Sequence, residues 1–105
     1  MINLTNLNEQ KFIDVAEYWG EKMPILQMEE CGELIQAVSK YERYAISVHP
    51  EEDYTKINNK AEVLRNNLLE EIRDVYISLE AIKHFYEIDD NEINGLIEKK
   101  LNKKY

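Results

Sequence analysis

The chain has 105 residues, which suits a single domain spanning residues 1–105 around one small core. Its 21 acidic residues against 13 Lys and Arg give a formal net charge of −8, which disfavours general binding to nucleic-acid phosphates. No apolar run is long enough to span a membrane, and the N-terminal segment lacks the pattern of a signal peptide. Because the single cysteine, Cys31, cannot form an internal disulfide, we expect a cytoplasmic protein.

Apolar residues spaced three and four apart predict helices throughout the chain. The first is expected over residues 8–19, and it ends at Gly20, a residue typical of helix C-terminal caps. The second begins at Pro24, which is favoured in a first helical turn, and runs to about Tyr44. A break containing His49-Pro50 follows, and the polar residues 51–60 are expected to form at most one short helical piece.

The third helix is the longest and is expected from about Lys60 to Tyr86, with one apolar stripe along its length. A fourth helix begins near the Asp89-Asp90 cap and extends into the C-terminal segment. No segment alternates with period two, so no sheet is predicted. We therefore expect an all-α protein, an antiparallel bundle of four to five helices, and its wide apolar faces favour oligomerisation.

Two acidic pairs lie on the second and third predicted helices. Glu30 and Glu33 are three residues apart, as are Glu71 and Asp74, so each pair directs two carboxylates to one side of its helix. Chance alone gives about four such pairs in a chain this acidic, and a solvated acidic face is the plain alternative. Both pairs, however, border the apolar stripe of their helix. Carboxylates converging there would repel one another unless a cation neutralised them.

Mg²⁺ fits such a set of oxygen ligands, and Mn²⁺ is a substitute. A di-iron carboxylate site is disfavoured because that chemistry uses Glu-x-x-His pairs, and neither His49 nor His84 belongs to an acidic pair. A second charged cluster, Lys99, Lys100, Lys103 and Lys104, lies near the C-terminus. It has two interpretations: cations that complement the C-terminal helix dipole, or groups that contact phosphate.

The stretches EECGELIQA at 29–37 and EEIRDVYISL at 70–79 resemble the MazG-like superfamily of all-α nucleoside triphosphate pyrophosphohydrolases. The resemblance implies that Glu30, Glu33, Glu71 and Asp74 are Mg²⁺ ligands. The ending EKKLNKKY is similar to a tail that contacts nucleotide phosphates in members of this superfamily, which implies roles for three residues, Lys100, Asn102 and Lys104. Trp19 takes the place of an aromatic residue that lies against the base, although a lone Trp also suits a core. The segment 46–60 makes the spacer between the acidic pairs longer than in compact members.

The activity implied by this resemblance is hydrolysis of an NTP or dNTP to the monophosphate and pyrophosphate. Mg²⁺ would position the attacking water, and Glu30 or Glu33 would act as the catalytic base. A non-enzymatic helical dimerisation or interaction module is the alternative, as is a degenerate enzyme that binds nucleotide without hydrolysing it. Four short helices together with this resemblance favour a homodimer or homotetramer. Neither nucleic acid nor membrane is an expected partner.

Overall fold

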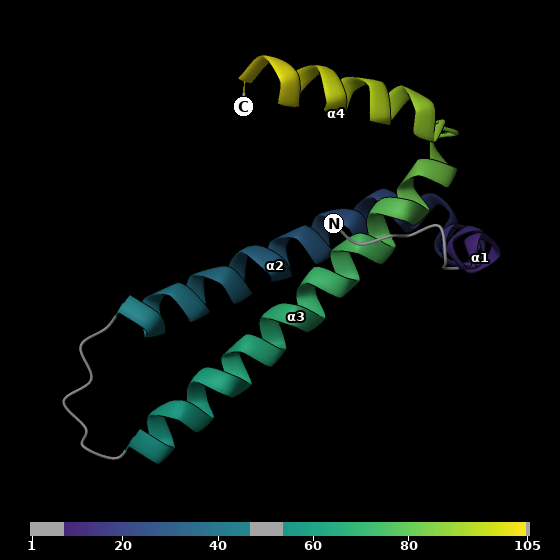
Figure 1. Ribbon diagram of the computed structural model, residues 1–105. Helices are drawn as coiled ribbons and strands as arrows, with labels where there is room; N and C mark the ends of the chain where they lie inside the picture. The colour runs from purple at the N-terminus through teal and green to yellow at the C-terminus, as the bar shows by residue number, and fades with distance from the viewer. Residues whose placement is uncertain (1–7, 47–53, 105) are drawn as a thin grey trace.

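The computed structural model describes residues 8–46 and 54–104, and all regular structure in these ranges is helical. The elements are α1 (Glu9–Trp19), the short 3-10 helix η2 (Gly20–Lys22), α2 (Met23–Ile46), α3 (Tyr54–Phe85) and α4 (Asp90–Lys104). The prediction of an all-α protein is thereby confirmed for the described part of the chain. Helices α2 and α3 form a long antiparallel hairpin, α1 packs against α3, and α4 projects from the end of α3 (Figure 1).

Both ends of α1 follow from the local sequence. The Asn8 side chain accepts a hydrogen bond from the backbone N–H of Gln10 at 2.9 Å, which satisfies a free donor of the first turn. At the other end Gly20 adopts a positive φ of 52°, and its N–H donates to the carbonyl of Ala16. A side chain at this φ would be strained, so Gly20 ends the helix at the predicted residue and lets the chain turn into α2.

Helix α3 is longer than the sequence indicated. It begins at Tyr54, six residues before the predicted start at Lys60. The expected short separate piece is therefore wrong for residues 54–60, which continue into the long helix without a break. No Gly or Pro occurs in this stretch, so nothing in it stops the helix, and its polar side chains lack the apolar stripe on which the prediction depended. The predicted break at His49-Pro50 lies outside the described residues.

A tightly bonded turn joins α3 to α4. Glu87 takes a left-handed conformation with φ of 55°, and the N–H of Ile88 donates to the Lys83 carbonyl at 2.9 Å. The Asp89 carboxylate then accepts from the N–H of Asn91 at 2.8 Å, while Glu92 accepts from the N–H of Asp89 at 3.1 Å. This reciprocal pair is a capping box, and it confirms the predicted helix start near Asp89.

The core is small and lies where α1 meets the hairpin. Ala16, Met23 and Ala81 are buried there, with Val15, Leu26, Ile82 and Phe85 packed around them. Many other large apolar side chains keep a third or more of their surface exposed. Within the described ranges, no helix is both long and apolar enough to cross a membrane. The fold therefore depends on one local core and on the contact between α2 and α3.

Met23 provides a test of this core because its side chain is fully buried. Replacing it with Ala should lower the free energy of unfolding by about 2–5 kcal/mol, the range for removing a buried Met side chain. Urea denaturation followed by circular dichroism measures the change. Met28→Ala is the matched control on the same helix, because 66% of the Met28 side chain is exposed. Equal effects of the two substitutions would contradict the placement of the core.

Candidate metal centre

The four acidic residues predicted to converge do so at the contact between α2 and α3. Glu30 and Glu33 come from α2, and Glu71 and Asp74 come from α3. One carboxylate oxygen from each lies within 4.8 Å of all the others. Exposed acidic groups gather on many proteins without any ion, so their proximity alone assigns no role. Their burial and their hydrogen bonds carry more information.

Two of the carboxylates are directed into the helix contact. Oε2 of Glu30 and Oε2 of Glu71 are buried, and neither has a hydrogen-bond partner. Glu33 is exposed, and Asp74 is half-buried. A buried carboxylate oxygen without a donor loses its hydration and gains nothing in exchange. These two oxygens are therefore acceptors that the protein itself leaves unsatisfied.

The electrostatic environment opposes ionisation of the cluster. Burial is the largest effect that raises the pKa of Glu30 above its ordinary value, followed by the negative charges of Glu33, Asp74 and Glu71. Burial likewise raises the pKa of Glu71, and the charges of Glu33 and Asp74 add to it. Both directions follow from charged groups that lie close together at a partly dry contact. A positive charge bound here would lower both pKa values.

The protein supplies a cation to one side of the cluster. Arg73 Nε donates to Asp74 Oδ1 at 3.0 Å. This pair is largely open to water, since 62% of the Arg73 side chain is exposed, so its contribution is weak. Arg73 thus partly neutralises Asp74 without reaching the buried oxygens of Glu30 and Glu71. The sequence pattern did not predict this contact between adjacent residues.

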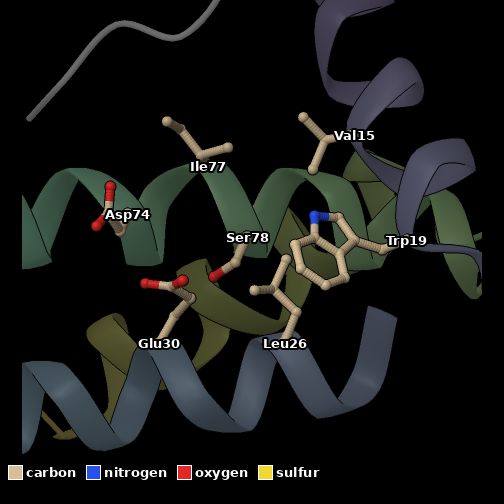
Figure 2. Close-up of a pocket in the computed structure, with 7 residues that line it drawn as sticks. All are labelled: Val15, Trp19, Leu26, Glu30, Asp74, Ile77 and Ser78. Carbon is tan, nitrogen blue, oxygen red and sulfur yellow. The ribbon is translucent and has the colours of Figure 1, made fainter. Parts of the chain in front are cut away.

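A pocket of about 220 Å³ opens beside the acidic cluster, between α1 and the hairpin (Figure 2). Its wall is mostly apolar, with Glu30 and Asp74 at one end and the Trp19 indole at the other (Figure 2). The residues that line it are Val15, Trp19, Leu26, Glu30, Asp74, Ile77 and Ser78. The arrangement suits a ligand with a flat apolar part at one end and a metal-binding or anionic part at the other.

The structure separates the predicted substrate-binding residues into two groups. Trp19 lines the pocket, with 38% of its surface exposed and an edge-to-face contact to Tyr18. Lys100, Asn102 and Lys104 are exposed on α4 and do not line the pocket. The helix that carries them leaves the end of α3 and projects away from the hairpin (Figure 1). Within one copy of the chain, these three residues are therefore not part of the pocket.

Ser78 is a pocket residue to which the sequence analysis gave no role. It is almost fully buried, and its Oγ donates to the carbonyl of Val75 at 2.9 Å. A lone pair on Oγ therefore remains as an acceptor at the pocket wall. The sequence feature that could have identified Ser78 as a site residue is its position four residues after Asp74, on the same side of the helix.

Comparison of the chain with models of known protein families, with curated proteins and with solved structures finds no match. The chain is therefore described by its own structure alone. It is an all-helical protein, over the described residues, with a cluster of four carboxylates beside a mostly apolar pocket.

The raised pKa of Glu71 leads to a prediction about the stability of the fold in the absence of metal. A carboxyl whose pKa is raised by folding contributes stability below its ordinary pKa, and this contribution is lost as pH rises through the raised value. At neutral pH the ionised Glu71 therefore destabilises the fold. Glu71→Gln should keep or raise the melting temperature in EDTA at neutral pH, measured by circular dichroism. Glu70→Gln, at an exposed neighbouring position, is the control and should have a smaller effect. A clear fall in melting temperature for Glu71→Gln alone would contradict this account.

Proposed function

We propose that this protein is a Mg²⁺-dependent nucleoside triphosphate pyrophosphohydrolase of the MazG-like type, with Mn²⁺ as a substitute ion. The observation that carries the proposal is the convergence of four carboxylates from two helices, two of which, Glu30 and Asp74, line one end of a mostly apolar pocket. The resemblance of residues 29–37 and 70–79 to the acidic stretches of that superfamily supports it. Under this proposal the substrate is an NTP or dNTP and the products are the monophosphate and pyrophosphate.

The donor set fits a hard divalent cation. All four groups are carboxylates, which such ions prefer, and the unsatisfied Oε2 atoms of Glu30 and Glu71 are free to coordinate. Glu33 and Asp74 complete the set that would hold the ion. When bound, the ion supplies a more acidic water and neutralises negative charge on the triphosphate. The negative charge of the cluster, which disfavours the metal-free fold, becomes the source of affinity.

Proton transfer is assigned to a glutamate of α2. Glu30 is one candidate, because its Oε2 is buried at the cluster and has no hydrogen-bond donor of its own. Glu33 is the other candidate, because its exposed carboxylate has access to solvent. The role of this residue is to accept a proton from the attacking water. The broken bond is the anhydride bond between the α-phosphorus and the bridging oxygen of the pyrophosphate leaving group.

The apolar part of the pocket is assigned to the base of the nucleotide. The Trp19 indole offers a flat surface for stacking, and Val15, Leu26 and Ile77 exclude water around it. Ser78 Oγ, whose own proton is donated to the Val75 carbonyl, keeps a lone pair and is the proposed acceptor for an N–H of the nucleotide. The base at this end and the phosphates at the acidic end match the polarity of the pocket (Figure 2).

The activity test is release of pyrophosphate from a panel of natural and modified NTPs and dNTPs in millimolar Mg²⁺. We expect release that stops in EDTA and falls at least about 100-fold in Glu71→Gln, since even residues that only support a metal ligand are worth 10–100-fold. Glu70→Gln is the matched control and should retain activity, because Glu70 lies outside the cluster.

The same samples give a binding readout that does not depend on turnover. Mg²⁺ should raise the melting temperature of the wild type but not that of Glu71→Gln, because an ion that binds the folded state stabilises it. Absence of both pyrophosphate release and metal-dependent stabilisation would reject the enzyme in favour of a helical interaction module. Metal-dependent stabilisation by nucleotide without release would indicate a degenerate enzyme.

Trp19 tests the orientation of the nucleotide. Trp19→Ala should raise KM by roughly 5- to 100-fold, because stacking of a base on an aromatic side chain is worth about 1–3 kcal/mol. Tyr18→Ala is the control from the adjacent position, since 83% of Tyr18 is exposed and it does not line the pocket. Steady-state kinetics on the best substrate of the panel provides the measurement. Equal KM values for wild type and Trp19→Ala would place the base elsewhere.

A further inference from the structure

Arg73 is a basic residue that lies against the acidic cluster. Its Nε donates to Asp74 Oδ1 at 3.0 Å, and among the ion pairs of the described residues this is the one that involves a member of the cluster. The side chains of Asp74 and Arg73 are 30% and 62% exposed, so the pair lies at the solvent edge of the contact between α2 and α3. A positive charge is therefore held at the edge of the carboxylates that would bind the ion.

This guanidinium and a metal ion would use the same carboxylate. Asp74 is one of the four residues whose carboxylate oxygens converge, and one of its oxygens already accepts a hydrogen bond from Arg73. An oxygen that accepts a charged hydrogen bond attracts a second cation less strongly. The buried Oε2 atoms of Glu30 and Glu71, by contrast, have no partner. Asp74 is therefore the member of the cluster for which a bound ion has to compete with the protein.

The charge of Arg73 affects a divalent ion more than it affects the fold. The exposed pair contributes little to stability, and its two residues are also neighbours in the unfolded chain. A divalent ion carries twice the charge of a lysine or arginine, so its repulsion from the guanidinium is doubled at equal distance. For charges several Å apart near a protein surface, this repulsion corresponds to about a three- to tenfold weaker affinity at low ionic strength.

We propose that Arg73 is a built-in counter-ion of the cluster, which occupies Asp74 in the metal-free protein and weakens the binding of the metal ion. This inference rests on the proposed function, because it concerns the ion that the four carboxylates would bind. On binding of the ion, the guanidinium leaves Asp74 Oδ1 for solvent, to which most of the Arg73 side chain is already exposed. Arg73 thereby keeps the ion exchangeable until a ligand with negative charge of its own joins it.

A role in holding Asp74 in place leads to the opposite expectation. If the hydrogen bond from Arg73 served to orient Asp74 for the ion, its loss would weaken ion binding. The bond, however, joins adjacent residues of one helix, and Asp74 is already directed to the cluster by its spacing of three residues from Glu71. The sign of the change in ion affinity therefore separates a counter-ion from an orienting group.

The test is a titration with Mn²⁺, the substitute ion, whose free form gives an electron paramagnetic resonance signal that is lost on binding. Arg73→Gln should bind Mn²⁺ about three- to tenfold more tightly than wild type at low ionic strength. The difference should shrink below about twofold near 1 M salt, where the Debye length is about 3 Å. Arg73→Lys keeps the charge and should bind as wild type does.

Arg65→Gln is the matched control, because it removes the same charge from the same helix. Arg65 is exposed and comes nine residues before Asp74, which places it about 180° around the helix and roughly 13 Å along it. Gln and Lys have helix propensities close to that of Arg, so the substitutions change the charge and leave the helix intact. The Mn²⁺ affinity of Arg65→Gln should stay within about twofold of wild type.

Equal Mn²⁺ affinities of Arg73→Gln and Arg65→Gln would overturn the proposal, as would weaker binding by Arg73→Gln. In either case the proposed function would stand, because wild type still binds the ion. A wild type that binds no Mn²⁺ would overturn both. Circular dichroism in EDTA checks that each variant is helical. Should Arg73→Gln fail to fold, Arg73→Ala replaces it with the same expected affinity, since Ala is the strongest helix former.

Discussion

The contact between α2 and α3 places like charges against each other, and the properties of the molecule depend on this constraint. Glu30 and Glu71 lie in the contact itself, where apolar residues of the same size would pack without electrostatic penalty. The raised pKa values of both residues show that the metal-free fold opposes their charge. Ionisable side chains thus occupy a helix contact where packing and electrostatics both favour apolar residues. Departures of this kind from the rules of stable packing concentrate at functional sites. A cation bound among the four carboxylates would offset this repulsion.

The same hairpin gives its two sides different chemistry. On one side α1 closes a pocket against Leu26 and Ile77, and Glu30 and Asp74 line one end of that pocket. On the other side, large apolar side chains such as Ile35 and Leu79 remain exposed. A two-helix unit cannot bury apolar surface on both of its broad sides by itself, and the small core around Met23 reflects this limit.

Much of the fold followed from local sequence rules. The Gly20 cap and the helix start near Asp89 depend on a few neighbouring residues, so the sequence predicted them. The Asn8 cap is equally local, although residue 8 was expected to be the first residue of the helix itself. The first turns of α3 were missed because residues 54–60 carry no apolar stripe, yet a polar segment continues a helix when nothing stops it. That α4 projects from the hairpin was not predictable either, since its apolar spacing resembles that of a packed helix. Spacing indicates a side of a helix but does not identify what covers it.

The candidate site, too, was predictable from the sequence only in part. The spacing of three residues within each acidic pair predicted which side chains converge, because this depends only on helix geometry and on the pairing of α2 with α3. The pocket beside them depends on α1, and Ser78 and Ile77 line it only because α1 packs at that height. The lysines of α4 show most clearly that sequence alone does not locate a residue relative to the pocket. Lys100 and Lys104 do not line the pocket of their own chain, and the Arg73 guanidinium is paired with Asp74. Under the proposed function, the positive charge that a triphosphate needs at this acidic pocket would come from a bound cation, because no Lys or Arg is among the residues that line the pocket.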